Sequence, residues 1–244
     1  MILAIETATA VCSVALELEH GRVVEKRTEG RGVHSEKTFT FIQELLDRNN
    51  LSVDDLDGLL FSSGPGSYTG LRIGAAAIKG LLFQKEVPLY TFCTLTSYAQ
   101  PSIKKAPVVI HAVIDARREH LYHRKVEVIK DSSDKQSKKM ENLPEDARNS
   151  TDSFLITRSD ARIMEIKELE KEILPGEIVS GTGWERMTHS DQERMLWSGS
   201  EKISATNLIR AWNSDILKPL FKREDVEQFE PDYLTMAQVN NSAI

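Results

Sequence analysis

The chain opens with apolar segments whose spacing is typical of β-strands. Apolar runs at 2–5, at 11–18 and from residue 23 onward are separated by short polar stretches, of which 19–21 is the clearest turn. Short runs of this kind, bounded by turn residues, indicate strands that pair with their neighbours in the sequence. Residues 2 to 28 are therefore expected to form a three-stranded antiparallel meander.

Between 35 and 49 the pattern changes to helical spacing. Apolar side chains recur every three to four residues, at Phe39, Ile42, Leu45 and Leu46. Positions at this spacing lie on one side of an α-helix, and paired asparagines at 49 and 50 end the pattern. An amphipathic helix is therefore expected here.

A buried strand, a glycine-rich loop and a second helix follow. Residues 59–62 are expected to form the strand and 69–84 the helix, and a further strand starts after Pro88. Three strands, a helix, a strand, a helix and a strand, in this order, indicate helices packed on a mixed sheet. The pattern alone thus predicts an α/β fold.

A boundary is expected at 104–107, where Lys104-Lys105-Ala106-Pro107 interrupts the apolar pattern. A second set of strands begins at 108–114, and 178–183 resembles a strand that ends in a tight turn. A capped helix is expected at 204–212. No strong pattern is visible beyond Pro219.

The second half also contains a polar stretch. Between 130 and 153 the composition shifts to Lys, Asp, Ser, Asn and Glu with few large apolar side chains, which predicts a solvated insertion. We therefore divide the chain into an N-terminal lobe, 1–105, which carries the glycine loop, and a C-terminal lobe, 106–244, which carries the insertion.

Composition narrows the classes of protein to consider. A chain of 244 residues with 40% hydrophobic content can bury a sizeable core, and its formal net charge of -6 argues against binding nucleic acid by itself. No stretch approaches 18 consecutive apolar residues, and the start lacks the basic region of a signal peptide, so we expect a cytoplasmic protein with no membrane association. Cys12 and Cys93 belong to no metal or redox motif and are expected to be buried thiols.

The glycine loop is the most specific local feature. It contains Gly64, Pro65, Gly66, Ser67, Thr69 and Gly70. Free N–H groups at the start of a helix attract anions, so phosphate binding is one interpretation, and a tight turn capped by Ser67 or Thr69 is the other. The lysine of a P-loop is missing, and the glycine spacing does not fit a dinucleotide-binding fingerprint.

The stretch 64–74, Gly-Pro-Gly-Ser-Tyr-Thr-Gly-Leu-Arg-Ile-Gly, resembles the signature of the TsaB (YeaZ) family. Three further segments are similar to that family in the same order along the chain. Residues 2–9 resemble its opening strand, 115–122 its Asp-Ala-Arg-Arg-x-x-x-Tyr segment, and 232–234 its Pro-x-Tyr-Leu terminus. The resemblance therefore extends over nearly the whole chain.

The resemblance implies a fold and a function. The fold would be the two-lobed actin-like ATPase (ASKHA) fold, with mixed sheets flanked by helices. The function would be that of a non-catalytic scaffold in the synthesis of N6-threonylcarbamoyladenosine at position 37 of tRNA. Such a scaffold binds and activates the transferase TsaD, acts together with the small ATPase TsaE, and meets tRNA only through the complex. No cofactor is expected in this chain alone, although the resemblance leaves room for a nucleotide at the interface with TsaD.

Three positions depart from the family pattern. Glu6 stands in place of the usual Asp, Tyr68 in place of Phe, and Thr235 in place of Arg. In related sugar kinases and actin-like proteins the Asp lies beside the metal and the phosphates, and one extra methylene would displace that carboxylate. Independent nucleotide chemistry is therefore less expected, and the sequence leaves the role of Glu6 open.

The residues that TsaD uses to bind its metal are also absent. Its His-Met-Glu-Gly-His stretch corresponds to residues 93–98 here, so that Thr94 and Tyr98 replace the two histidines. Neutral hydroxyl groups do not substitute for imidazole in a transition-metal site. His120 and His123 would face opposite sides of a strand, so neither a metal nor a catalytic residue is assigned.

A second class of function is an autonomous enzyme with the actin fold, either a small-molecule kinase or a glycoprotease-like peptidase. The cluster His34-Ser35-Glu36 resembles part of a deaminase motif, but no Pro-Cys-x-x-Cys follows, and a helix start explains it better. No His-Glu-x-x-His is present for a zinc peptidase.

The last prediction concerns partner binding. The expected interface consists of Phe39, Ile42, Leu46, Gly74, Ala77 and Leu81. Small residues along one helix face allow close approach of another helix, either from the chain's own fold or from a partner. The resemblance favours the partner, because this family pairs with TsaD through these helices, and we expect a homodimer when the chain is alone.

Overall fold

The first sheet of the computed structural model is assembled from both ends of the chain. Its order is β12-β5-β4-β1-β2-β3; β1, β2 and β3 are antiparallel, whereas β4 and β5 run parallel to β1. The predicted meander is confirmed, but β12, which pairs antiparallel with β5, was not predicted. The strands are β1 (Ile2–Glu6), β2 (Val11–Glu17), β3 (Val23–Glu29), β4 (Gly58–Ser62), β5 (Leu89–Phe92) and β12 (Lys222–Glu224).

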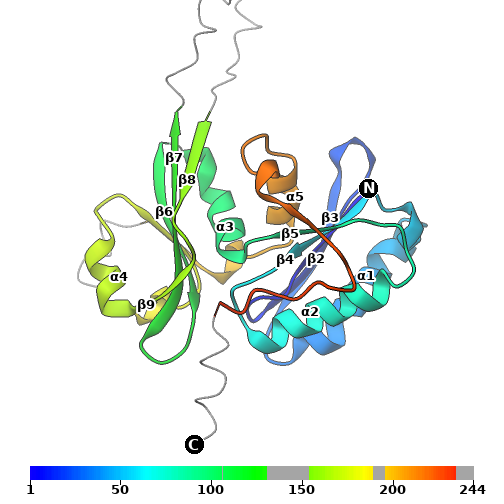
Figure 1. Cartoon of the computed structure of the whole chain (residues 1–244), viewed down its shortest axis with the longest axis horizontal. Helices are drawn as coiled ribbons and strands as arrows, with labels where there is room; N and C mark the ends of the chain where they lie inside the picture. The colour runs from blue at the N-terminus through cyan, green and yellow to red at the C-terminus, as the bar shows by residue number, and fades with distance from the viewer. Residues whose placement is uncertain (106, 131–153, 189–195, 235–244) are drawn as a thin grey trace, which may run out of the picture.

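Helices pack on both faces of this sheet, as Figure 1 shows. α1 and α2 lie side by side and bury one core against it, α5 covers the other face, and α3 lies between the two lobes. The helices predicted at 35–49 and 69–84 are confirmed, although the second ends earlier, at Leu81. Their bounds are α1 (Val33–Arg48), α2 (Tyr68–Leu81), α3 (Thr94–Ala99) and α5 (Thr206–Trp212).

The second sheet has the order β11-β10-β6-β7-β8, and β9 also pairs with β7. α4 (Ile166–Glu172) packs on its outer face over a core that includes Val113, Leu121 and Val179. The strands predicted at 108–114 and from 178 are confirmed, whereas β8, β9, β11 and α4 were not predicted. The strands are β6 (Val108–Asp115), β7 (His120–Lys130), β8 (Phe154–Arg158), β9 (Arg162–Glu165), β10 (Ile178–Gly181) and β11 (Leu196–Ser198).

The structure describes residues 1–105, 107–130, 154–188 and 196–234. Apart from Lys130, which ends β7, the predicted polar insertion lies outside these residues. None of the helices within them is long and apolar enough to cross a membrane. Short 3-10 helices join the elements at Glu19–Gly21, Val53–Asp55, Gln100–Lys105, Trp184–Arg186, Ser200–Lys202 and Lys218–Leu220.

The two sheets repeat one topology. In the first, the hairpin β1-β2 is followed by β4 and β5, which are added in parallel on the β1 side. In the second, the hairpin β6-β7 is followed by β10 and β11 in the same way. Each lobe is therefore built on its own mixed sheet of the same topology, and helices pack against each sheet.

The chain returns to the first lobe after β11. α5 buries Leu208 and Ile209 against the first sheet, and β12 extends that sheet beyond β5. The first sheet therefore includes residues from both sides of position 105. Whether 1–105 and 106–244 fold as independent domains stays a prediction.

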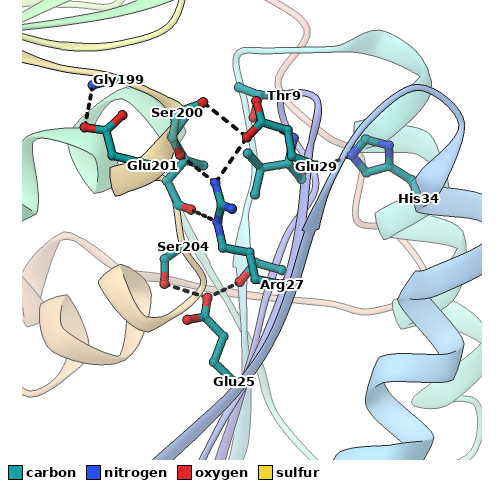
Figure 2. Close-up of polar contacts among 12 residues, drawn as sticks. Thr9, Glu25, Arg27, Glu29, His34, Gly199, Ser200, Glu201 and Ser204 are labelled. Atoms are coloured by element: carbon teal, nitrogen blue, oxygen red, sulfur yellow. Dashed lines mark hydrogen bonds and ion pairs between the residues drawn. The ribbon is translucent and has the colours of Figure 1, made fainter.

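The segment that returns to the first lobe, residues 200–204, is hydrogen-bonded to the edge strand β3 (Figure 2). Arg27 Nε donates to the Ile203 carbonyl oxygen at 2.9 Å, and its Nη2 donates to that of Ser200 at 2.7 Å. The Ser204 hydroxyl donates to Glu25 Oε1 at 2.7 Å. These contacts connect residues about 175 positions apart and hold the segment between β11 and α5 against the first lobe.

Candidate functional site

The glycine loop joins β4 to α2 and uses several of its N–H groups inside the chain. Gly64 N donates to Thr94 Oγ1 at 2.9 Å, and Ser67 N donates to the Ala8 carbonyl oxygen at 2.6 Å. Ser67 is the N-cap of α2, and its hydroxyl accepts from Gly70 N at 3.2 Å. Capping by Ser67 is therefore confirmed, and it satisfies one of the free donors at the helix start.

Close backbone contacts explain the glycines of the loop. A Cβ atom on Gly66 would lie 2.3 Å from the Ala8 carbonyl oxygen, and one on Gly70 would lie 2.1 Å from the carbonyl that follows β1. Gly64 has a φ of +119°, and a Cβ there would lie 2.1 Å from the Asp232 carbonyl oxygen. The geometry thus supports the tight, capped turn. Anion binding stays a prediction. Of the other loop residues, Pro65 is buried, whereas Ser67 and Thr69 are exposed.

Glu6 ends β1 with its side chain completely buried. Its Oε1 accepts from Ala8 N at 2.7 Å and lies 3.4 Å from the Tyr98 hydroxyl oxygen, which donates to it. Burial raises the pKa of Glu6 to about 7, against the opposite effect of hydrogen bonds from Ser62, Ala8 and Tyr98. The carboxyl group is therefore turned inward and partly protonated at neutral pH, instead of facing an open site.

The two residues at the TsaD metal-ligand positions are engaged in the same interior. Thr94 Oγ1 accepts from the Ser62 hydroxyl at 3.1 Å and from Gly64 N. Tyr98 is 2% exposed, and burial together with the Glu6 charge raises its pKa well above the usual range. Across the described ranges, no group of three or more His, Cys, Asp or Glu side chains is arranged to hold a metal.

The structure divides the predicted partner interface. Ile42, Leu46 and Ala77 are at most 4% exposed and belong to the chain's own interior. A Cβ on Gly74 would lie 2.5 Å from Thr7 Oγ1 and within 3 Å of the Phe61 ring. These four positions therefore face the sheet of the isolated chain, which corrects their assignment to a partner-facing surface.

The opposite side of the helix pair is open. Phe39 is 52% exposed and Phe83 66%, and the small residues Ala76 and Gly80 are exposed between them. A Cβ on Gly80 would meet only the Phe39 ring, at 3.7 Å. We call this surface the outer face and define it by Phe39, Ile73, Ala76, Gly80, Leu81 and Phe83, of which Ile73 and Leu81 are half-buried.

Phe39 and Leu81 were predicted from the sequence as interface residues, whereas Ala76 and Gly80 were missed. Ala76 and Gly80 lie four residues apart, as Gly70 and Gly74 do. That spacing was therefore a usable signal. The sequence did not show which of the two small-residue stripes would be covered by the sheet.

The sequence also missed a buried histidine cluster in the second lobe. His120 and His123 face opposite sides of β7, as predicted. The His123 ring contacts that of His111 on β6, and the two ring nitrogens lie 3.0 Å apart. His111 Nε2 lies 2.8 Å from Glu177 Oε2. Burial is the main cause that lowers the pKa of His123 to about 3, and it also lowers that of His111. Both rings are therefore neutral at pH 7.

His34 and the two cysteines are the remaining candidate residues. His34 lies in the first turn of α1, with its Nε2 3.2 Å from the Val11 carbonyl oxygen, in agreement with a helix start. Cys12 is buried, but Cys93 is only half-buried, which corrects that part of the prediction. Neither thiol forms a disulfide.

Comparison with known proteins identifies the chain's relatives. The family described as "TsaD: tRNA N6-adenosine threonylcarbamoyltransferase" matches residues 29–149. The protein named "tRNA threonylcarbamoyladenosine biosynthesis protein TsaB" from Haemophilus influenzae is 36% identical over 127 residues, which is 51% of this chain and 53% of that protein. Its Escherichia coli counterpart is 36% identical over 122 residues, or 50% and 52%. The matched regions thus span about half the length of these relatives.

Solved structures extend the likeness to the whole fold. YeaZ from Pseudomonas aeruginosa superposes with a TM-score of 0.67 over 95% of this chain and 98% of its own, at 23% identity. A protein described as similar to peptidase YeaZ from Pseudomonas aeruginosa gives a TM-score of 0.68 over 96% and 99%, at 24% identity. The chain is therefore similar to TsaB (YeaZ) proteins over about half its length, and its fold is the two-lobed actin-like fold.

Proposed function

We propose that this chain takes part in the biosynthesis of threonylcarbamoyladenosine on tRNA as a non-catalytic scaffold that binds and activates a TsaD-like transferase. The biosynthetic role is supported by the names of its relatives, several of which are TsaB proteins 31–36% identical in the matched region. The scaffold role is supported by the geometry of the chain itself.

The observation that carries the proposal is the closed interior around Glu6. A transferase that uses a bound metal needs ligands with free lone pairs and an open coordination position. In this chain Thr94 already accepts two hydrogen bonds, and Tyr98 donates to a buried carboxyl group. The chemistry would therefore belong to the partner.

The outer face is the surface that we propose for the transferase. Exposed aromatic rings beside small residues give a partner helix both apolar area and room for close approach. The same face would pair with a second copy of the chain when the transferase is absent, since an isologous dimer buries it twice. A nucleotide at the interface with the transferase and a TsaE-like ATPase in the complex complete the proposal.

Contact with tRNA would be indirect. The formal net charge of -6 offers little release of counterions, which is the main source of affinity for a phosphate backbone. We therefore expect the isolated chain to bind tRNA weakly, and the transferase to provide most of the basic surface. A gel-shift titration of the chain alone in 150 mM salt measures this.

Reconstitution tests the proposal. Unmodified tRNA is incubated with threonylcarbamoyl adenylate as the group donor, with ATP and with the purified components, one component being omitted at a time, and modified nucleosides are measured by mass spectrometry. Modification is expected only when the TsaD-like transferase is present, and it should fall when this chain is omitted. Modification by this chain without the transferase would overturn the scaffold role.

A double variant tests whether the two missing histidines alone explain why the chain would bind no metal. Thr94→His with Tyr98→His restores the two histidines that the resemblance assigns to TsaD. We expect neither stoichiometric zinc or iron nor transferase activity, because further ligands and their supporting hydrogen bonds would still be missing. Metal analysis and the same reconstitution assay measure both. An autonomous kinase, by contrast, would bind ATP and magnesium without a partner.

A further inference from the structure

A cavity between the lobes lies across α3 from Glu6. Its volume is about 330 Å³, and it is lined by residues of β5 and β12 on one side and of β7 and β8 on the other. Thr96 lines this cavity, whereas Tyr98, two residues later on the same helix, contacts Glu6. Residues two apart on a helix point in nearly opposite directions. The cavity is therefore separate from the interior described above.

Arg124 is the central side chain of the cavity wall. It lies on β7 next to His123, and because side chains alternate along a strand it faces α3 while His123 faces α4. Its Nη1 donates to Thr96 Oγ1 at 3.0 Å, and its Nε is buried without a hydrogen-bond partner. The half-buried guanidinium is thus held by a neutral hydroxyl group.

Arg158 adds a second cation beside the first. In the register of β7 and β8 it lies opposite Val126, which places it diagonally next to Arg124 on the same face of the sheet. Diagonal neighbours in an antiparallel pair are about 7 Å apart, within reach of long side chains. Among residues 1–105, 107–130, 154–188 and 196–234, no carboxylate forms an ion pair with Arg124 or Arg158.

Two neighbouring guanidinium groups repel each other, and burying one of them without a counter-ion costs free energy. An anion bound between them would offset both effects. A carboxylate or phosphate accepts two parallel N–H bonds from each guanidinium, which makes this pair suited to such a group. We propose that the cavity binds a small molecule through a carboxylate or phosphate group held between Arg124 and Arg158.

The opposite wall limits the size and charge of the ligand. Lys222 contributes a third cation, but Glu224, Glu230 and Asp232 also line the cavity, and Glu224 accepts from the Thr91 hydroxyl at 2.8 Å. Carboxylates that line the same cavity as the arginines repel a polyanion such as an RNA backbone. A compact ligand with one anionic group, and with hydroxyl or amino groups that meet the acidic wall, fits both sides.

Calorimetric titration of the full chain at low ionic strength, with inorganic phosphate and separately with acetate, tests this site. We expect millimolar binding of at least one anion by the wild type. Arg124→Gln and Arg158→Gln should each weaken it about tenfold. The matched control is Arg223→Gln, because Arg223 lies on β12 between two cavity residues but is itself exposed outside the cavity.

The two probes also assign the ligand. Binding of phosphate alone indicates a phosphate group, and binding of acetate, with or without phosphate, indicates a carboxylate. Wild-type affinity in both arginine variants, equal weakening in Arg223→Gln, or no binding of either anion by the wild type would overturn the proposal. Should Arg124→Gln unfold, Arg124→Lys keeps the charge and is expected to weaken binding less than Arg158→Gln does.

Discussion

The interior around the glycine loop and the outer face of α1 and α2 contain similar residues in different situations. On the inner side of α2, Gly70 and Gly74 let the helix approach the end of β1, and aromatic Phe61 fills the space beside them. On the outer side, Ala76 and Gly80 are exposed, and a Cβ on Gly80 would be in ordinary contact with the Phe39 ring. The first region shows how small residues close a core, and the second shows the same residues available to a partner.

This difference predicts opposite consequences for the same substitution. A side chain added on the inner side has to displace backbone or a buried ring, so it costs folding free energy. A side chain added on the outer side costs the fold little and changes only what can dock there. The four predictions below follow that contrast, from the largest expected effect to the smallest.

Gly74→Leu should destabilise the fold by roughly 4 kcal/mol or more, because even its Cβ would overlap Thr7 Oγ1 and the Phe61 ring. Urea unfolding followed by circular dichroism measures the loss. Gly80→Leu is the matched control on the same helix and should change the free energy of unfolding by less than about 1 kcal/mol. Equal stability of the two variants would contradict the assignment of inner and outer sides.

Glu6→Gln should change the pH dependence of stability. The pKa of Glu6 is raised from 4.5 to about 7 in the folded chain, so its contribution is fully present below pH 4.5 and is lost as pH rises through about 7. The amide cannot ionise, and the variant should therefore gain up to about 3 kcal/mol relative to the wild type between pH 4.5 and pH 8.

Chemical denaturation at several pH values measures this difference. His123, whose pKa is lowered to about 3, contributes a slope of opposite sign below pH 6.5, but it is present in both proteins and cancels. Glu168→Gln on the exposed side of α4 is the control and should leave the profile unchanged. A difference between wild type and Glu6→Gln that is constant with pH would show that Glu6 is not held in its protonated form.

Gly80→Leu should weaken binding of the TsaD-like transferase about tenfold, which corresponds to roughly 1.4 kcal/mol. The added side chain would lie beside the exposed Phe39 ring, where close approach of a partner helix is expected. Analytical size exclusion and calorimetry measure both the complex and the homodimer. Glu168→Leu adds the same side chain to the other lobe and should bind like the wild type.

Phe83→Ser should have the smallest effect. The ring is 66% exposed, so its loss is expected to change stability by less than about 0.5 kcal/mol and to weaken self-association a few-fold. Leu174→Ser is the control, because Leu174 is 59% exposed on the second lobe. Sedimentation velocity over a range of concentrations distinguishes them, and equal dimerisation of all three proteins would place the contact elsewhere.

The sequence predicted those parts of the fold whose signals are local. Apolar runs bounded by turn residues were sufficient for β1 to β5, and helical spacing was sufficient for α1 and α2, because these signals lie within each element. β12 has only three residues, Lys222 to Glu224, and none is apolar. It is a strand because β5 offers it an edge, and no local pattern carries that information.

The candidate site was less predictable, because it depends on which surfaces meet. Small and apolar residues lie on both sides of α2, so Arg72 and Lys79 on its outer side gave only a weak signal of which side faces solvent. His111 and His123 meet only through the register of β6 and β7, which pairs His123 with Val113. The buried state of Glu6 likewise follows from Tyr98, 92 residues away. These arrangements are properties of the assembled sheets.

The Arg27 contacts have a consequence for the kinetics of assembly. The two hydrogen bonds from this guanidinium hold segment 200–203 on the first lobe, so the connection between β11 and α5 is restrained before any partner arrives. A surface fixed in advance loses little conformational entropy when it is covered. Encounter with the transferase should then resemble docking of rigid bodies, with single-phase association whose rate rises linearly with concentration.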